Sequence, residues 1–495
     1  MEKPKIQMKN IQVEFDRLKK NGKSAKSMQM REDLLKAFIQ GLQAVMPDRL
    51  IENSVFVNGT ELKISSRLTT QSIRYDLLRY SKILIIGGGK ATAGLVKAVL
   101  TKVGNILPCY GSINIPKGQE ELWGEHIVYT SDSGIHSKID IVYASHPIPD
   151  EDGIKGTKRI MKLASSADLD TLVLVIISGG GSALMPLPKK PITIAALKSL
   201  NSIMLESGAN IIEINAVRKH ISDFKGGQLA RIIHPRTAVS LILSDVRGDP
   251  IDSIASGPTT YDTSTYNISW QIIEKYRIVH MVPESVRVVL RKGVNGLLSE
   301  TPKQNNPIFS KITNLVIGSA TTAVNEIRNF IENQGYNESR ALLSPELFGE
   351  AKAMGKKLAE LILSDRFSQE QIKRKLYFLN SGECTVTVKG EGKGGRNQEM
   401  LLALLEELNG TAIPNFNIAV LSMAFDGIEG NSPSAGAIID TDTLKEVKNN
   451  DLEISKYLSE NDSYSFFKQL EDAIEIGQTG TNVNDIYGIL IDLTN

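Results

Sequence analysis

The chain has 495 residues, and its 57 Lys and Arg nearly balance its 56 Asp and Glu, which argues against nucleic-acid or anionic membrane partners. Its 41% hydrophobic residues can fill the cores of two or three domains. The two cysteines, Cys109 and Cys384, cannot build a disulfide framework, and the apolar runs are too short to span a membrane. We therefore expect a protein of the reducing cytoplasm, with no nucleic-acid or membrane partner.

Residues 1–32 are more basic than the rest of the chain. The first 31 residues contain nine Lys or Arg and three acids, without the apolar segment of a secretory signal. A run of this charge is typical of a solvated segment. We predict a basic N-terminal helix or arm that lies in solvent and can be removed without loss of activity.

Short apolar runs alternate with glycine turns and helical patterns from residue 33 to about residue 290. Continuous apolar runs are typical of strands that are buried on both faces, as in a parallel sheet. We predict a Rossmann-like α/β domain over 33–290, whose ligands bind beyond the carboxyl ends of the strands. The predicted strands are residues 83–86, 139–144, 172–177 and 238–243.

The turn at residues 87–90 follows the first of these strands and precedes a predicted helix at 91–100. It lacks the dinucleotide fingerprint, because Thr92 replaces the last glycine, and it lacks the Walker A spacing as well. Free N–H groups at a helix start still attract anions, and Lys90 adds a positive charge. The turn is a candidate anion site, although a purely structural turn is the alternative.

A second turn, at residues 178–182, places three glycines between two serines at the end of a strand. Such a backbone can curl into a nest of N–H groups that holds an anion. A tight turn with a helix cap is the alternative, and it is compatible with anion binding. The predicted phosphate- or carboxylate-binding residues are Ser178, Gly179, Gly180, Gly181 and Ser182.

A third candidate is the helical pattern at 215–222, followed by a basic glycine turn. Asn215, Arg218, Lys219 and Ser222 have the spacing of one helix face. The alternative is an ordinary solvent-exposed face. We predict further substrate contacts from Asn215, Arg218, Lys225 and Gly226.

Two acids follow the strand at 238–243. Asp245 and Asp249 are four residues apart, with Arg247 between them. Acids at this position suit a Mg²⁺ ion held through few carboxylates, or a base that accepts a hydroxyl proton. Loop caps are the alternative interpretation.

A second α/β domain with a mixed sheet is predicted over 311–495, after a linker at 293–307 that is rich in Gly, Asn and Pro. We expect a hairpin around 381–383, with strands at 376–379 and 385–388. Further expected strands are 312–317, 418–423, 437–439 and 486–491, with a helix at 321–333. The polar loops of this domain contain Gly394, Gly395, Arg396, Asn397, Asp426, Thr481, Asn482 and Asn484.

Taken together, these stretches resemble the glycerate 2-kinase family, whose C-terminal part is called the MOFRL domain. The resemblance runs in the family's order from about residue 33 to residue 493, with the MOFRL region at about 375–493. It is carried by residues 89–91, 146–150, 178–182, 215–227, 243–249, 256–259, 394–398 and 479–485.

This resemblance implies ATP-dependent phosphorylation of D-glycerate at its C2 hydroxyl, which gives 2-phosphoglycerate and ADP, with a divalent metal taken to be Mg²⁺. It also implies an active site in a cleft between two domains and a catalytic role for Lys90 and Arg396. By their chemistry, Asp245 and Asp249 are assigned as catalytic or metal-binding acids. The glycine-rich and polar loops of the second domain are assigned to the nucleotide.

Alternatives remain at this point. A hydroxypyruvate reductase that uses NAD(P)H is one, although the nicotinamide fingerprint is broken at Thr92. A non-catalytic protein that binds a sugar acid or a nucleotide is another, because Phe425 and Glu429 depart from the family's pattern of Thr and Asp. A homo-oligomer is compatible with the sequence.

Overall fold

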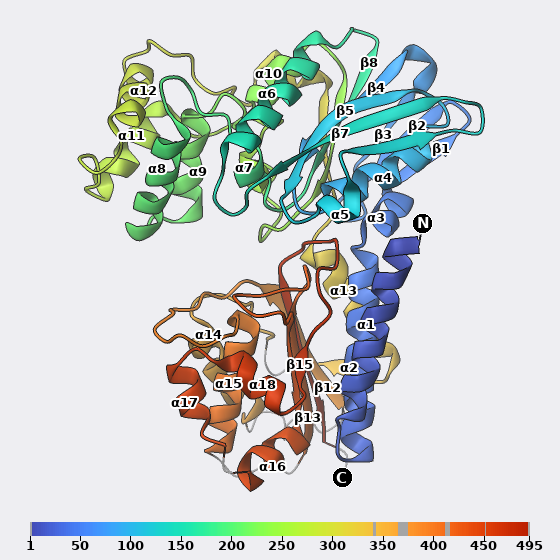
Figure 1. Ribbon diagram of the computed structural model, residues 1–495, viewed down its shortest axis with the longest axis vertical. Coiled ribbons are helices and arrows are strands. Elements are labelled where there is room, and N and C mark those ends of the chain that lie inside the picture. The colour runs from blue at the N-terminus through green and yellow to red at the C-terminus, as the bar shows by residue number, and fades with distance from the viewer. Residues whose placement is uncertain (1, 340–342, 365–374, 411–415, 451, 494–495) are drawn as a thin grey trace. The chain divides into compact units, whose positions relative to one another are not determined.

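The computed structural model describes residues 2–339, 343–364, 375–410, 416–450 and 452–493. The chain forms two compact units (Figure 1). The parallel-sheet unit is Pro47–Ser319, and the mixed-sheet unit combines Met1–Met46 with Ala320–Asn495. Among the described residues, no helix has both the length and the apolar character needed to cross a bilayer.

The parallel-sheet unit is built on seven strands in the order β10-β9-β8-β4-β5-β7-β6, and only the β6/β7 pair is antiparallel. The chain winds outward in both directions from β4 and β8, which is the Rossmann arrangement with its switch point between these two strands. The predicted Rossmann-like, largely parallel sheet is therefore confirmed. The strands are β4 (Lys82–Gly88), β5 (Cys109–Pro116), β6 (His126–Thr130), β7 (His136–Ala144), β8 (Thr171–Ile177), β9 (Ala238–Leu243) and β10 (Ile312–Gly318).

The central strands are buried along their whole length, since β8 and β9 have no exposed residue. Glycine allows β4 to lie against β8: a Cβ on Gly87, whose φ is +146°, would stand 1.9 Å from the carbonyl oxygen of Ile176. Helices cover both faces of the sheet (Figure 1). The flanking helices include α4 (Thr92–Val103), α6 (Glu151–Ser166) and α10 (Gln228–Ile233), with α3 (Pro47–Ser54), α5 (Glu120–Trp123) and α7 (Gly181–Leu184) as shorter elements.

Four further helices form a separate cluster at one end of this unit (Figure 1). Their shared core contains Val217, Tyr266, Ile273 and Leu290, all buried. This cluster matters for function because α9 leads directly into the basic glycine turn. The helices of the cluster are α8 (Ile194–Glu206), α9 (Ile211–His220), α11 (Tyr266–Lys275) and α12 (Glu284–Val294).

A small antiparallel sheet completes the unit, with the strands β1 (Val55–Asn58), β2 (Glu61–Ser65) and β3 (Ser72–Asp76). The unit also contains three 3-10 turns, η1 (Leu77–Arg79), η2 (Ile254–Ser256) and η3 (Pro307–Lys311).

The mixed-sheet unit contains a six-stranded sheet in the order β11-β12-β16-β13-β14-β15. Only β11 and β12 run parallel, so the predicted mixed sheet is confirmed. The strands are β11 (Asn337–Glu338), β12 (Lys375–Gly382), β13 (Asn417–Ala424), β14 (Gly436–Asp440), β15 (Ala473–Ile474) and β16 (Asp485–Asp492).

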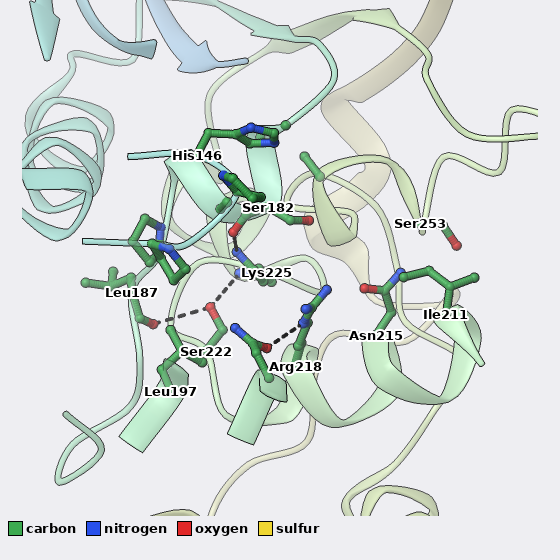
Figure 2. Close-up of a pocket in the computed structure, with 18 of the residues that line it drawn as sticks. His146, Ser182, Leu187, Leu197, Ile211, Asn215, Arg218, Ser222, Lys225 and Ser253 are labelled. Carbon is green, nitrogen blue, oxygen red and sulfur yellow. Dashed lines mark hydrogen bonds between the residues drawn. The ribbon is translucent and has the colours of Figure 1, made fainter. Parts of the chain in front are cut away.

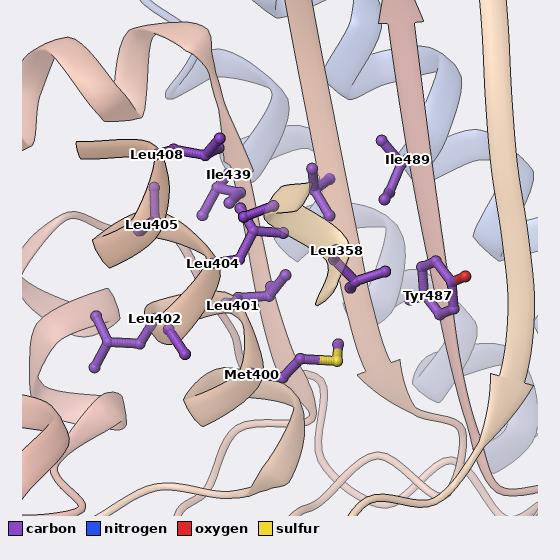
Figure 3. Close-up of a cluster of buried hydrophobic side chains, with 14 of the residues drawn as sticks. Leu358, Met400, Leu401, Leu402, Leu404, Leu405, Leu408, Ile439, Tyr487 and Ile489 are labelled. Atoms are coloured by element: carbon purple, nitrogen blue, oxygen red, sulfur yellow. The ribbon is translucent and has the colours of Figure 1, made fainter. Parts of the chain in front are cut away.

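Helices pack on both faces of this sheet. On one face, Leu401, Leu404 and Leu408 of α15 pack against Ile439 and Ile489 of the sheet (Figure 3). On the other face, a Cβ on Gly488 would stand 3.0 Å from Leu34 of α2, because alternate residues of β16 point in opposite directions. The helices are α1 (Glu2–Lys20), α2 (Ala25–Ala44), α13 (Ala320–Asn333), α14 (Ala351–Ile362), α15 (Arg396–Asn409), α16 (Thr441–Asn449), α17 (Ile454–Ser459) and α18 (Ser463–Gln469).

The N-terminal segment is helical, as predicted, but the expectation that it lies in solvent is wrong. Ile11, Phe15 and Leu18 of α1 are buried. On α2, the buried guanidinium of Arg31 pairs with Asp440 at 2.5 Å and with Asp472 at 2.7 Å. The prediction relied on the number of charged residues in the segment, and that number does not reveal that the apolar residues share one helix face.

The boundary between the two halves also differs from the prediction. Strand β10, expected in the second domain, pairs with β9 in the parallel sheet, so the chain enters the mixed-sheet unit at Ala320. The proposed linker at 293–307 packs inside the parallel-sheet unit, where Glu300 contacts His220 at 3.0 Å. Sequence patterns identify an apolar strand but not the sheet that it joins.

The expected hairpin around 381–383 does not form. Strand β12 continues through Gly382 and pairs with β11 and β16. The predicted strand at 385–388 is a loop with a single bridge between Thr385 and Glu350. Cys384 and Val386 of this segment contact the core, but Thr385, Thr387 and Val388 are exposed.

Candidate active site

The turns that follow β4 and β8 are joined to each other at the switch point of the parallel sheet. The backbone N–H of Lys90 donates to the carbonyl of Gly179 at 2.8 Å. The hydroxyl of Ser178 accepts from the N–H of Ala91 at 3.0 Å and lies 3.1 Å from the hydroxyl of Thr92. Ser178 therefore fixes the first turn, and its hydroxyl is occupied within the fold.

A cavity of about 410 Å³ lies beside these turns, and every residue that lines it belongs to the parallel-sheet unit (Figure 2). It lies at the carboxyl ends of the strands, where ligands of such sheets bind. The structure thus brings together predicted site residues from three separate segments of the chain. These are Gly180, Gly181, Ser182, Asn215, Arg218, Lys225 and Asp245.

Two cations form one wall of the cavity. Lys225 is only 6% exposed, and its Nζ donates to the carbonyls of Ser182 at 2.8 Å and Met185 at 3.2 Å. Burial and the charge of nearby Arg218 lower the pKa of Lys225 to about 7. The Nε of Arg218 donates to Asn201 at 2.9 Å, and burial lowers the pKa of its guanidinium.

Within the described ranges, neither Arg218 nor Lys225 forms an ion pair with an acid. Placing two positive charges in a partly desolvated wall is costly unless a negative charge offsets them. The wall is therefore suited to an anionic ligand.

Asp245 lies in the same cavity and adjoins Lys90. Burial raises the pKa of Asp245 above its ordinary value, and the charge of Lys90 and a hydrogen bond from the backbone of Gly180 act against that rise. The side chain of Lys90 lies 3.4 Å from the position that a Cβ on Gly180 would occupy. Lys90 thus lies next to the cavity wall, although it is not among the residues that line the cavity.

Some predicted site residues lie outside the cavity lining. Asp249, at φ +55°, does not line it, and neither do Ser178, Gly179 and Gly226. Lys219 was predicted on the same face as Arg218, but it is buried and pairs with Asp252 at 3.1 Å and Asp262 at 3.4 Å. On this predicted helix face, Asn215, Arg218 and Ser222 line the cavity, whereas Lys219 forms ion pairs inside the protein.

Serine contacts position the predicted residues Ser182 and Asn215. The hydroxyl of Ser256 lies 2.9 Å from that of Ser182 and donates to the amide oxygen of Asn215 at 3.2 Å. Ser256 and Ala255 have positive φ values of 59° and 49°, which non-glycine residues rarely adopt. Strained backbone of this kind collects at functional sites, where the surrounding structure enforces it.

Sequence reasoning missed His146 and the apolar part of the lining. His146 follows β7, and its ring lies 2.9 Å from the position of a Cβ on Gly180. Its place directly after a predicted strand was the available signal, but residues 146–150 were used only for the family resemblance and His146 was assigned no role. The sequence analysis also assigned no site role to three apolar lining residues, because apolar residues on helices are normally assigned to a core. These residues are Leu197, Leu205 and Ile211.

The positions of Asp245 and Asp249 determine which of them could bind a divalent metal ion. The described residues contain no group of three or more His, Cys, Asp or Glu that could hold an ion. Mg²⁺ needs fewer protein ligands, because one or two carboxylates and the phosphates of a substrate suffice. Asp245, in the cavity, fits that requirement, whereas Asp249 lies outside the lining.

In the mixed-sheet unit, Arg396 is the first residue of α15. Its guanidinium donates to both carboxylate oxygens of Asp485 and, at 2.6 Å, to Glu383. Although burial acts to lower the pKa of Arg396, the pairing with Asp485 raises it above the ordinary value. The side chain is held rigidly in its charged form.

Glu429 caps the same helix. Its carboxylate accepts the backbone N–H groups of Asn397 at 2.7 Å and Gln398 at 3.0 Å, as well as both of their side-chain amides. Burial and the neighbouring Asp485 raise the pKa of Glu429 to about 7. The second departure, Phe425, is buried and packs on Phe38. Both departures from the family pattern therefore take part in the fold.

The other predicted nucleotide-binding residues also lie in the mixed-sheet unit. The hydroxyl of Thr481 donates to the carbonyl of Val45 at 2.6 Å, and the amide oxygen of Asn397 accepts from Ser422 at 2.5 Å. These polar groups are occupied within the fold, and a nucleotide role for them stays a prediction. The remaining members are Gly394 and Gly395 before α15, Asp426 after β13, and Asn482 and Asn484 before β16.

Fold and site together define a Rossmann-like α/β protein that has a cavity lined by Arg218 and Lys225 at its switch point and that continues into a mixed-sheet unit. The family described as a domain of unknown function (DUF4147) matches residues 33–291, and the MOFRL family matches residues 376–485. The chain belongs to the glycerate 2-kinase family.

Relatives support this assignment along most of the chain. A protein of Pyrococcus horikoshii named glycerate 2-kinase is 32% identical over 93% of this chain and 97% of its own. The crystal structure of a glycerate kinase from Thermotoga maritima has a TM-score of 0.74 and 32% identity, and covers 92% of this chain and 98% of its own. A putative hydroxypyruvate reductase of Agrobacterium vitis is 35% identical over 83% of this chain and 87% of its own.

Proposed function

We propose that this protein transfers a phosphoryl group from ATP to the C2 hydroxyl of D-glycerate and so forms 2-phosphoglycerate and ADP. The observation that carries the proposal is the cavity at the switch point, whose cations Arg218 and Lys225 lack acidic partners in the described ranges. Both substrates are anions, and the names of the relatives agree with this activity.

Charge stabilisation and positioning dominate phosphoryl transfer, because the transition state is loose and leaves little covalent work to the protein. Arg218 and Lys225 bind the anionic groups of the substrates on one side of the cavity. Lys90 stabilises the moving phosphoryl group beside Asp245, with which it interacts. The backbone at Gly180 and Gly181 keeps the ligand close to both turns.

Asp245 is the residue that would hold Mg²⁺, since a single carboxylate and the phosphates of ATP satisfy that ion. When bound, Mg²⁺ supplies positive charge that neutralises the phosphate oxygens during transfer. Asp245 also orients the C2 hydroxyl by accepting a hydrogen bond from it. Asp249 is not part of this proposal, because it lies outside the cavity lining.

Arg396 is the proposed second catalytic cation. Its rigid pairing with Asp485 and Glu383 fixes the direction of the guanidinium, and such preorganised charge costs no rearrangement during the reaction. This role rests on the family resemblance of the segment around Arg396 rather than on a cavity near it.

We also propose that the protein works in the cytoplasm. Its two cysteines, Cys109 and Cys384, are free thiols and buried. Free thiols are typical of proteins in a reducing compartment.

A coupled assay of ADP release tests the proposal. With D-glycerate and Mg-ATP, we expect ADP and 2-phosphoglycerate in equal amounts. Oxidation of NADH by hydroxypyruvate, with no ADP formed from glycerate, would instead establish the reductase. The turn at residues 87–90 argues against a reductase. Its dinucleotide fingerprint would require glycine at position 92, where Thr92 is instead buried against Ser178. Substrate binding without any turnover would establish a sensor.

A further inference from the structure

The cavity has an apolar wall that a three-carbon acid does not explain. Leu187, Leu197, Leu205 and Ile211 line it together with the two cations. In Figure 2, Leu187 and Leu197 lie on one side of Arg218 and Lys225, and Ile211 lies on the other. Leu205 is 64% exposed and Ile211 is 56% exposed, so the apolar surface reaches the mouth of the cavity.

D-glycerate has a polar group on each of its three carbons and so has no apolar face to bury. A volume of about 410 Å³ falls in the range of roughly 300–1,000 Å³ that is typical of pockets for larger organic ligands. Exposed leucine and isoleucine side chains at a cavity mouth gain free energy only when an apolar surface covers them. The ligand that completes this cavity is therefore larger than glycerate and partly apolar.

We propose that this wall binds the nucleoside part of ATP, with the base against Leu205 and Ile211 and the phosphates directed toward Arg218 and Lys225. The inference rests on the proposed kinase function and adds to it the location of the donor nucleotide. It moves that location from the loops of the mixed-sheet unit to the helices α8 and α9.

Three features support a nucleotide in this orientation. The flat faces of a base are apolar and can cover the exposed side chains of Leu205 and Ile211. The phosphates supply the negative charge that Arg218 and Lys225 lack among the described residues. Asn215 and Ser253 also line the cavity and offer polar groups that suit a ribose.

Neighbouring residues on α9 provide a matched pair of variants. Ile211 and Ile212 are the first two residues of the helix, after the cap Asn210, and both are largely exposed. Only Ile211 lines the cavity. Because both side chains are exposed in the first helical turn, Ile211→Ser and Ile212→Ser should fold alike.

The test is the affinity of ADP and of inorganic tripolyphosphate, measured by calorimetry on the full-length protein. We expect Ile211→Ser to weaken ADP binding about tenfold or more, the effect of removing apolar contacts from a pocket. Tripolyphosphate should bind the variant as it binds the unchanged protein, because it has no base. Ile212→Ser should leave both affinities unchanged.

Unchanged ADP affinity in both Ile211→Ser and a second variant, Leu205→Ser, would overturn the inference. So would equal weakening of ADP and tripolyphosphate, because that would show a general distortion of the cavity. These results differ from a failure of the proposed function, which would appear as ADP binding without any phosphorylation of D-glycerate by the unchanged protein.

Discussion

Lys225 is a buried amine whose charge depends on what occupies the cavity. Burial and Arg218 lower its pKa to about 7, so above that pH the amine of the empty cavity is mostly neutral. The unfolded chain binds this proton more tightly, with a pKa of about 10.4, so Lys225 makes the fold more stable as pH rises from about 7 to 10. An anion in the cavity offsets the effect of Arg218 and raises the pKa again.

We therefore expect substrate binding at pH 8 to take up a proton at Lys225, up to about one per site. The affinity for ADP should fall as pH rises above 7. Calorimetry in two buffers with different ionisation heats measures the uptake. In Lys225→Met the uptake should vanish, and an uptake equal to that of the unchanged protein would assign the proton to another group.

Lys90 offers a direct test of the charge argument. We expect Lys90→Ala to lower kcat/KM for D-glycerate by roughly 100-fold or more, because a cation next to the transferred group is lost. Its backbone contacts to Gly179 do not involve the side chain, so the fold should persist. Steady-state kinetics with a thermal melt as control gives the answer. Activity within a few-fold of normal would remove Lys90 from the active site.

Arg396 has a structural role as well as its proposed catalytic one. Arg396→Ala leaves the buried carboxylate of Asp485 without its main partner, which should cost about 3–5 kcal/mol of folding free energy. Activity should also fall roughly 100-fold. Arg396→Lys keeps the charge and most of the stability, yet should remain impaired, since lysine lacks the forked geometry. Urea unfolding measured beside kinetics separates the two effects. Normal kcat/KM in Arg396→Ala would confine this residue to the fold.

At the scale of elements, helix α1 is part of the core of the mixed-sheet unit. Because Ile11, Phe15 and Leu18 are buried, removing residues 1–30 should cost about 5 kcal/mol or more and impair the protein, contrary to the expectation from sequence. Phe15→Ala alone should cost about 3–5 kcal/mol. Val13→Ala is the control, since Val13 is 62% exposed. Equal denaturant midpoints for the two variants would show that α1 does not pack as described.

The elements that sequence predicted best are those that are buried on both faces. Strands β4, β8 and β9 were found within a residue or two because they are continuous apolar runs that end in glycine or serine turns. Strand β10 was also found, but it was placed in the wrong sheet, because pairing with β9 depends on contacts distant in sequence. The apolar face of α1 was missed because its charges dominate the composition.

At the scale of the whole molecule, the topology made much of the site predictable. Parallel strands place their carboxyl ends at one edge, so the turns after β4, β8 and β9 had to lie near one another. The exact lining was not predictable in the same way. Asp245 meets the cavity and Asp249 does not, a difference set by the strained loop that follows β9. The wall from α8 and α9 depends on helix packing that no local pattern encodes.

Hydrogen exchange tests most directly whether the reaction takes place at this switch-point cavity. With ADP and D-glycerate at about 100 times their dissociation constants, amides in residues 178–186 and 215–228 should exchange up to about 100-fold more slowly wherever exchange requires the site to open. Protection confined to other segments, in a protein that phosphorylates D-glycerate, would contradict the account.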